Sequence, residues 1–368
     1  MSTSPDIIVI GGGIAGISAA AALAQDARVT VLESEPQLGY HSTGRSAAIF
    51  IRNYGNATLR ALNAAAYPAL AGDLLGESVL SVRGELLVVQ EHELDSLADY
   101  LKGASDVDQL TADEAHALVP VLRREKIAAA VIERDAQDID VDRLLQGCNR
   151  LLRDRGGTVL TGQPVTDIQQ NGTGWRVTTR DNDFTTGIIV NAAGAWADHV
   201  AAMADVPGVN LQPMRRSAVL MAVPDDVGPV RDWPLFGSVS EGGQGWYAKP
   251  DGNRLMISPA DEDPVDPQDA WPDDMVLAEG LYRFEQMVDV PIVKPSHSWA
   301  GLRSFAPDRT PVVGFDPAAH GFFWLAGQGG YGVQTSPALA ALTRAICTGA
   351  QDDLTEKMAA SLSPNRFR

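Results

Sequence analysis

Short apolar runs alternate with segments of helical character from the N-terminus onward and predict an α/β fold. Residues 7–10 are a β-branched run typical of a buried parallel strand. Residues 17–24 are rich in alanine and predict a helix, and residues 28–32 predict a second strand that ends in Glu33. This order predicts a strand-helix-strand unit with two parallel strands.

Glycines at fixed spacing fill the turn between the first strand and the helix. In Gly11-x-Gly13-x-x-Gly16 the first glycine allows the tight turn, the second lets a pyrophosphate approach the backbone, and the third lets helix and strand pack closely. The N–H groups that start the helix attract a doubly negative ligand, and Glu33 can accept hydrogen bonds from a ribose. The sequence therefore predicts a dinucleotide site at Gly11, Gly13, Ile14, Ala15, Gly16 and Glu33.

A polar, glycine-punctuated stretch follows the second strand at residues 36–48. Composition alone predicts a surface loop. In a dinucleotide fold, however, the second strand ends at the ribose of the ligand, so the residues just after it lie near the cofactor. Ser42, Thr43, Arg45 and Ser46 are therefore candidate donors to the cofactor.

Strand patterns dominate the rest of the chain. Residues 80–89 predict one strand, and the apolar residues 187–191 predict a strand that returns the chain to the first sheet. Residues 208–298 are strand-rich and proline-punctuated, which predicts an antiparallel sheet. Residues 322–326 predict a strand that joins a helix starting near Thr335 through a glycine-rich turn, so the positive end of that helix faces any anion beside it.

Length and charge narrow the class of protein. The 368 residues suffice for two domains, with 45% apolar and 21% charged residues as in ordinary globular proteins. A net charge of −18 argues against nucleic acid or an anionic membrane as partner. The uncharged stretch 7–24 is about as long as a short membrane span, but it is rich in glycine and alanine and lacks a basic region before it, so we expect neither a span nor a signal peptide. We expect a cytoplasmic protein.

No group of residues has the spacing of a metal site or a disulfide. Cys148 and Cys347 lie in apolar, helix-like contexts and are interpreted as buried thiols. The acidic run Asp138-Ile-Asp140-Val-Asp142 lacks the glycine and the terminal glutamate of a calcium loop, so we expect these acids to cap a helix that follows.

Five ordered motifs link the chain to a known family. They are Gly-Tyr-His-Ser-Thr-Gly-Arg-Ser-Ala-Ala at 39–48, Pro-Val-Leu-Arg-Arg at 120–124, Leu-Gln-Pro-Met-Arg-Arg-Ser at 211–217, Trp-Ala-Gly-Leu-Arg-Ser-Phe at 299–305 and Gln-Gly-Gly-Tyr-Gly-Val-Gln-Thr-Ser at 328–336. Together with the N-terminal glycine motif they resemble the FAD-dependent D-amino-acid oxidase superfamily, and within it most closely the D-arginine dehydrogenases, over nearly the whole chain.

The resemblance implies an α/β flavoprotein of two domains. A Rossmann-like FAD-binding domain would consist of residues 1–80, 141–203 and 301–368. An α+β substrate domain on a mixed or antiparallel sheet would consist of residues 81–140 and 204–300.

The resemblance also implies the roles of individual residues. Arg216 and Arg303 would clamp a substrate carboxylate, since a planar guanidinium suits bidentate binding. Tyr54 and Tyr247 would close over the substrate, and Glu85 would meet a cationic side chain. Further FAD contacts would come from Ala47, Ala48, Val165, Ala193, Gly194, Trp196, Arg303, Gly330, Tyr331, Gly332, Val333, Gln334 and Thr335.

Two departures from the family pattern bear on substrate choice. Ile49 stands where the family has a pocket histidine, which makes the local wall more apolar. The loop at residues 241–245, ahead of Tyr247, is longer and richer in glycine than the pattern. Both departures leave the preference for basic or apolar side chains open. Residues 327–336 contain no cysteine, so we expect FAD to be bound without a covalent link there.

The predicted reaction is oxidation of the Cα–N bond of a D-amino acid. Hydride transfer to the flavin would give an imino acid that water hydrolyses to a 2-oxo acid and ammonia. One alternative keeps the fold and takes an N-methyl or cyclic secondary amino acid. Others are an NAD-dependent dehydrogenase, which a single glycine motif with a terminal acid permits, and a non-catalytic flavoprotein subunit. The electron acceptor, and the choice between monomer and homodimer, stay open.

Overall fold

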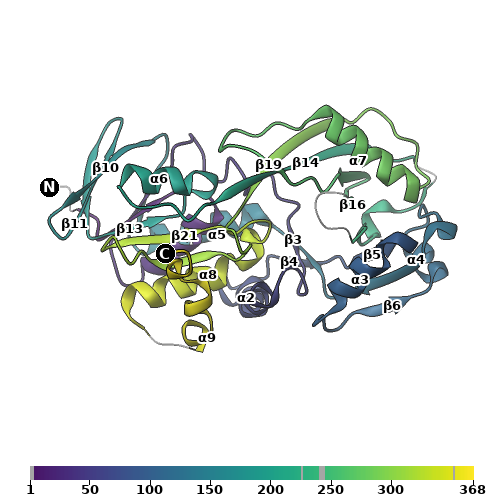
Figure 1. The fold of residues 1–368 in the computed structure, drawn as a ribbon, viewed down its shortest axis with the longest axis horizontal. Helices are drawn as coiled ribbons and strands as arrows, with labels where there is room; N and C mark the ends of the chain where they lie inside the picture. The colour runs from purple at the N-terminus through teal and green to yellow at the C-terminus, as the bar shows by residue number, and fades with distance from the viewer. Residues whose placement is uncertain (1–3, 225–226, 240–244, 351–352) are drawn as a thin grey trace.

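Two β-sheets lie toward opposite ends of an elongated molecule (Figure 1). The computed structural model describes residues 4–224, 227–239, 245–350 and 353–368. The loop at 241–245, singled out above for its length, therefore lies outside the described residues except for Gly245.

The first sheet is parallel except for one antiparallel edge strand. Its order is β20-β21-β13-β1-β2-β9, and only the β20–β21 pair is antiparallel. The bounds are β1 (Ile7–Ile10), β2 (Val29–Leu32), β9 (Thr158–Leu160), β13 (Ile188–Asn191), β20 (Val312–Phe315) and β21 (Phe322–Ala326).

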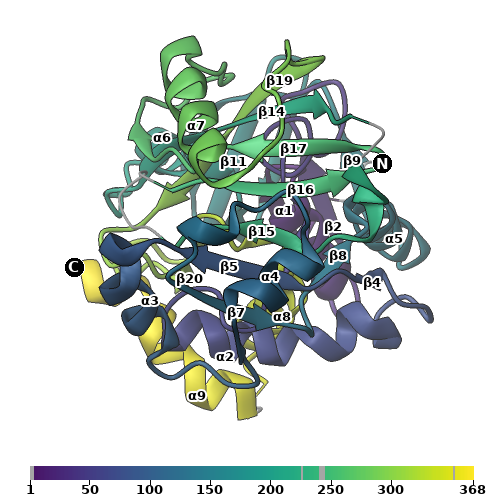
Figure 2. The same ribbon diagram turned by 90° about the vertical axis from the view of Figure 1, so that its right-hand side faces the viewer.

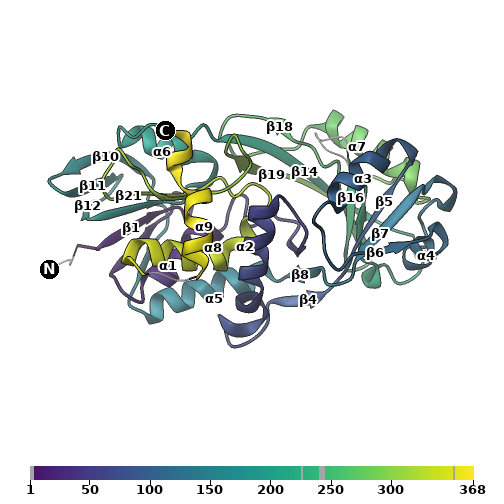
Figure 3. The ribbon, with the colours of Figure 1, turned by 60° about the horizontal axis from the view of Figure 1, so that its bottom comes forward.

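Both faces of this sheet are covered, which explains why β1 is apolar at every position. Ile7 and Val9 point into a core formed with α1, α5 and α8, whereas Ile8 and Ile10 point into a core formed with α6 and the small sheet β10-β11-β12. Figure 3 shows α1, α5 and α8 side by side on one face of this sheet. The bounds are α1 (Ile14–Leu23), α5 (Val141–Asp154), α6 (Ala197–Met203), α8 (Gly332–Thr348), β10 (Val165–Asn171), β11 (Gly174–Thr179) and β12 (Asp183–Thr186).

The second sheet is mixed and larger. Its order is β18-β14-β17-β16-β15-β5-β7-β6 with β19 also paired to β14, and its described pairs are antiparallel except β15 with β5. The bounds are β5 (Glu85–Val89), β6 (Asp108–Leu110), β7 (Ala129–Glu133), β14 (Gln212–Ala222), β15 (Leu235–Gly237), β16 (Tyr247–Asp251), β17 (Arg254–Ser258), β18 (Asp263–Pro264) and β19 (His297–Phe305).

Helices α4 (Ala112–Leu118) and α7 (Asp274–Met287) cover the outer face of the second sheet, as Figure 2 shows. Phe236 and Trp246 of the sheet pack there against Phe284 of α7. The opposite, inner face of the second sheet is therefore directed toward the first sheet. The remaining elements are α2 (Ala57–Pro68), α3 (Leu94–Leu101), α9 (Asp353–Leu362) and the small sheet of β3 (Ile49–Phe50), β8 (Gln137–Ile139) and β4 (Leu80–Val82).

These observations confirm the predicted α/β class, a Rossmann-like sheet joined to a mixed substrate-domain sheet. The boundaries given for the two domains stay a prediction. The prediction of a single strand at 80–89 was wrong. The segment is divided into β4 and β5, which belong to different sheets. The division falls at Gly84, which lies between the two strands and has a left-handed φ of +80°.

Of the three acids at 138–142, only Asp140 caps α5 as predicted. Asp140 Oδ1 accepts a hydrogen bond from Arg143 N at 2.9 Å, and Asp138 instead pairs with Arg83 and Lys249. Within the described part of the chain, no helix combines the length and the apolar character that crossing a bilayer requires.

Replacing Gly16 with alanine should destabilise the first sheet. A Cβ at this position would overlap the carbonyl oxygen of Gly11, because α1 packs directly against the turn that precedes it. We expect the free energy of unfolding in urea to fall by about 1–3 kcal/mol. Gly187→Ala is the matched control, since its Cβ would lie 3.7 Å from Asp6 O, an ordinary van der Waals contact, and its stability should stay near wild type. Equal stabilities for the two variants would contradict this view of the turn.

Candidate functional site

A cavity of about 490 Å³ extends from the β1–α1 turn to the inner face of the second sheet. Most residues predicted for the site line it. They are Gly11, Gly13, Ile14, Ala15, Glu33, Ser42, Thr43, Arg45, Ser46, Ala47, Val165, Ala193, Gly194, Trp196, Arg216, Tyr247, Arg303, Gly330, Gly332 and Val333. Gly16, Ala48, Tyr54, Glu85, Tyr331, Gln334 and Thr335 were also predicted but are not among the lining residues.

The nucleotide end of the cavity is organised by Glu33. This residue is only 8% exposed, and its Oε2 accepts a hydrogen bond from Gly12 N at 2.6 Å. Its Oε1 accepts a second one from Glu35 N at 2.8 Å. The carboxylate thus ties the end of β2 to the glycine turn, where a dinucleotide fold places the ribose.

The turn itself leaves room and donors for a pyrophosphate. Gly11 has a φ of +114°, and a Cβ there would overlap Ala192 O, so the backbone lies as close to β13 as it can. Helix α1 begins after Gly13 without a side-chain cap, while Thr43 Oγ1 accepts the Ile14 N–H at 3.0 Å. A helix start that lines a cavity and has no cap from its own N-cap residue fits the diphosphate of a dinucleotide.

The loop after β2 connects the two sheets. Arg45 Nη1 donates to the carbonyls of Ala270 and Ala300, and its Nη2 donates to Asp269. Ser42 Oγ donates to Leu302 O at 2.7 Å. These contacts fix the loop against β19; donation from Ser42 and Arg45 to FAD stays a prediction.

The two arginines lie on one face of the second sheet because of strand register. Arg216 of β14 lies opposite Gly301 of β19, and Arg303 lies opposite Met214. Arg216 and Met214 are two residues apart, so both arginines point to the same side as diagonal neighbours. Gly301 has no side chain, and Arg45 packs over it: a Cβ at this position would lie 3.3 Å from Arg45 Cβ. Tyr247 of β16 shares this face and lines the same cavity.

Charge and burial change the properties of these groups. Burial opposes ionisation of the Tyr247 phenol, but the guanidinium groups of Arg303 and Arg216 outweigh it and bring the pKa of Tyr247 below its ordinary value. Burial would lower the pKa of Arg303, yet Tyr54, Tyr247 and the Glu262 carboxylate raise it overall. Arg303 therefore stays cationic, as a carboxylate anchor requires.

Tyr54 contacts the arginine rather than the cavity. Its hydroxyl accepts a hydrogen bond from Arg303 Nη1 at 3.1 Å, and its ring lies 4.6 Å from that of Tyr331. The preceding residues are held by Glu133 of β7, which accepts hydrogen bonds from Arg52 N, Asn53 N and Asn53 Nδ2. Sequence reasoning missed Glu133, since no local pattern marks a strand glutamate as the anchor of a distant loop.

Glu85 is buried beside Glu133. The two residues lie opposite each other on β5 and β7, and Glu85 Oε2 accepts a hydrogen bond from Tyr100 at 3.2 Å. Burial and the Glu133 charge raise the pKa of Glu85 to about 8, although the Tyr100 hydrogen bond opposes them. Its predicted contact with a cationic substrate stays a prediction, because the carboxylate is not among the groups that line the cavity.

Other predicted residues support the cavity from behind or stand apart from it. The Gln334 amide accepts a hydrogen bond from Ile51 N and donates one to Ile51 O. Helix α8 begins at Gly332, three residues before the expected start. Ile49 begins β3 and is not among the lining residues. His41 and Trp299 line the cavity but had not been assigned to the site, since neither belongs to a spacing that marks a ligand contact.

The fold and this cavity are those of an α/β protein that binds a dinucleotide at the β1–α1 turn. The sequence model of one family, described as DAO: FAD dependent oxidoreductase, matches residues 6–346. The chain therefore belongs to this family, and its cofactor is FAD rather than a nicotinamide.

Known relatives are distant and chemically varied. The chain is 22% identical over 388 residues to hydrogen cyanide synthase subunit HcnC of Pseudomonas aeruginosa, covering 91% of this chain and 90% of that protein. It is 25% identical to L-2-hydroxyglutarate dehydrogenase of Indibacter alkaliphilus, and that match spans only about half of each chain, 54% and 52%.

Solved structures share the fold over the full length. Glycine oxidase from Geobacillus kaustophilus aligns with a TM-score of 0.81 at 23% identity, covering 95% of this chain and 96% of that one. L-proline dehydrogenase from P. horikoshii aligns with a TM-score of 0.83 at 22% identity, covering 100% and 98%. At these identities the likeness establishes the fold.

Removing the Glu33 carboxylate should weaken FAD binding. Glu33→Ala loses the bond to Gly12 and the acceptor for the ribose, and a hydrogen bond to a charged group contributes about 1.5–3 kcal/mol. We expect the Kd for FAD, measured by fluorescence of the released flavin, to rise at least about tenfold. The exposed Glu356 on α9 offers the control Glu356→Ala, and a similar Kd for both variants would contradict the role of Glu33.

The buried Glu85 carboxyl should make stability depend on pH. Between its ordinary pKa of 4.5 and the folded value of about 8, the unfolded chain loses a proton that the folded chain keeps. Wild-type stability should therefore fall as pH rises through this window and level off above it. Glu85→Gln removes this effect, so its free energy of unfolding relative to wild type should increase from about pH 5 to 8 and then stay constant. Urea titrations across this range test it, with the exposed Glu91→Gln as control; a constant difference for Glu85→Gln would refute it.

Proposed function

We propose that this protein oxidises the Cα–N bond of an amino acid, with FAD as the hydride acceptor. One observation carries the proposal: strand register places Arg216 and Arg303 on one face, inside a cavity that continues to the dinucleotide turn. Paired guanidinium groups bind a carboxylate in a fixed orientation. The substrate Cα–H is thereby held facing the part of the cavity that the flavin ring would occupy.

The bound flavin supplies the redox chemistry by accepting a hydride from carbon. The chain contributes binding and orientation. Arg303 and Arg216 hold the carboxylate, and Tyr247, on the same face, closes the pocket beside it. The glycines at 329, 330 and 332 lie where α8 begins, so the N-terminus of this helix stabilises negative charge on a ring seated there.

The D configuration is the finer part of the proposal. It is supported by the motifs at 211–217 and 299–305, which resemble those of D-amino-acid oxidising enzymes and carry the two arginines. The proposed preference for a basic side chain rests on Glu85 alone. The Glu85 carboxylate is bonded to the Tyr100 hydroxyl, and this contact adds no support to that preference.

A secondary amino acid is the second candidate substrate. The wall beside Arg216 is apolar and consists of Ala218, Met256 and Trp299, which suits an N-alkyl group better than extra polar contacts. The names of distant relatives, dimethylglycine dehydrogenase of Mus musculus and L-proline dehydrogenase among them, agree with this candidate.

Arg303→Met should abolish efficient reduction of the flavin by amino acids. Losing a carboxylate-binding guanidinium costs about 2–5 kcal/mol of transition-state binding, so kcat/KM should fall at least about 30-fold. The measurement is anaerobic bleaching of the flavin absorbance by D-arginine, D-leucine, D-alanine and N-methylglycine. Arg254→Met, a half-exposed arginine on the neighbouring strand β17, is the control and should retain wild-type rates.

The same panel tests the reaction as a whole. Bleaching of the FAD-loaded wild type by at least one amino acid is the expected result. If no member of an extended panel of D-, L- and N-alkyl amino acids bleaches it, the proposed function is wrong.

A further inference from the structure

The two arginines of the site differ in their partners. Arg303 donates to the Tyr54 hydroxyl, and no carboxylate of the described residues lies within ion-pair distance of it. Arg216, by contrast, is bound on two sides: its Nε donates to Asp261 O at 2.7 Å, and its Nη2 lies 3.2 Å from Glu262 Oε1. The side chains of Arg216 and Glu262 are only 13% and 18% exposed, so water screens this pair little.

Glu262 is held in place by a third arginine. Arg309 Nη2 lies 3.0 Å from both carboxylate oxygens, and its guanidinium stacks 3.9 Å from the centre of the Phe305 ring. The Arg309 side chain is 46% exposed, so solvent screens its charge. Arg309 therefore orients Glu262, while the negative charge of Glu262 acts on the buried Arg216, with which it pairs, and also on Arg303.

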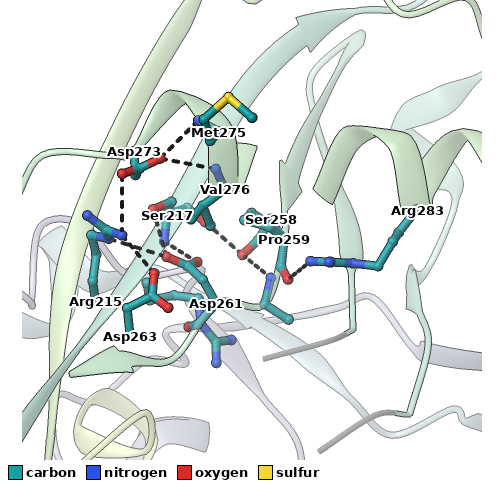
Figure 4. Close-up of polar contacts among 12 residues, drawn as sticks. Arg215, Ser217, Ser258, Pro259, Asp261, Asp263, Asp273, Met275, Val276 and Arg283 are labelled. Atoms are coloured by element: carbon teal, nitrogen blue, oxygen red, sulfur yellow. Dashed lines mark hydrogen bonds and ion pairs between the residues drawn. The ribbon is translucent and has the colours of Figure 1, made fainter. Parts of the chain in front are cut away.

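The backbone that carries Glu262 is fixed to β14 (Figure 4). Asp261 is 3% exposed, and its two oxygens accept hydrogen bonds from Ser217 N at 2.7 Å and Ser217 Oγ at 2.8 Å. Ser258 Oγ donates to Ser217 O at 2.7 Å on the other side of the turn, and Asp263 pairs with Arg215. This turn cannot swing away without leaving Asp261 buried and unpaired. The position of Glu262 beside Arg216 is therefore fixed by the surrounding backbone.

We infer that Glu262 determines specificity by cancelling one of the two positive charges at the substrate end of the cavity. With Arg303 and Arg216 positive and Glu262 negative, the site carries one net positive charge, which complements a single carboxylate. A second carboxylate on the substrate would be repelled by the negative charge of Glu262, which lies behind Arg216. The inference rests on the proposed function and narrows its substrate class to amino acids with one carboxylate.

The test compares binding of propanoate and malonate to the FAD-loaded enzyme. These unreactive acids are similar in size and differ by one carboxylate, and their Kd values follow from perturbation of the flavin absorbance at constant ionic strength and a pH at which malonate is a dianion. Glu262→Gln keeps the shape and the hydrogen-bond acceptor for Arg216 but removes the charge. We expect the ratio of the malonate Kd to the propanoate Kd to fall at least about tenfold in this variant.

Two further variants control for other effects. Glu262→Asp retains the charge and should keep the wild-type ratio. Glu279→Gln removes an exposed charge from α7, alters the net charge by the same amount, and should leave the ratio unchanged. Thermal unfolding of the FAD-loaded variants confirms that each is folded.

The outcomes separate this inference from the proposed function. If Glu262→Gln leaves the ratio unchanged, or if Glu279→Gln changes it equally, the inference is overturned, while propanoate binding that is lost in Arg303→Met still supports the carboxylate site. If neither acid perturbs the flavin of any folded variant, the carboxylate site itself is absent and both proposals fail.

Discussion

The antiparallel pairing of β14 with β19 is the constraint on which the site depends. Its register, from Gln212 opposite Phe305 to Leu220 opposite His297, sets the face to which every side chain on both strands points. A slip of one residue would turn Arg216 or Arg303 to the outer face, where α4 and α7 pack. The same pairing carries the substrate end of the cavity across to the first sheet, because the loop after β2 bonds to carbonyls on β19.

Buried carboxylates fix the loops that this pairing brings together. Glu33 accepts an N–H from the glycine turn, Glu133 accepts those of Arg52 and Asn53, and Asp261 accepts that of Ser217. In the first two cases the donors lie outside the strands and would otherwise lack a partner, whereas Ser217 belongs to β14 and its bond ties the Asp261 turn to that strand. A charged acceptor gives stronger bonds than a neutral one, at the cost of burying an acid. Some carboxylates of this acidic chain are therefore buried hydrogen-bond acceptors that hold backbone segments together.

Fold and chemistry are separable in this family. Distant relatives are named for hydroxy acids as well as for amines, and likeness of fold does not choose between them. The cavity of this chain has its own distribution of charge around Arg216 and Arg303. Arg303 donates its hydrogen bond to Tyr54, whereas Arg216 forms an ion pair with Glu262, which also pairs with the more exposed Arg309. The electrostatics of the pocket therefore depend on a residue that does not line it.

The sequence by itself determined the nucleotide end of the protein. The glycines at 11, 13 and 16 and the acid at 33 lie close along the chain, and their roles follow from local backbone geometry that the pattern encodes directly. It also predicted the α/β class, and motif resemblance named Arg216, Arg303 and Tyr247, which the structure brings to one cavity. Only the tertiary structure decided that 80–89 divides between two sheets, that Glu85 faces Glu133, and that Glu262 neutralises Arg216. The Glu85–Glu133 and Arg216–Glu262 contacts join residues that are 46 or more positions apart in the sequence. Such contacts depend on strand register and burial, which no local pattern specifies.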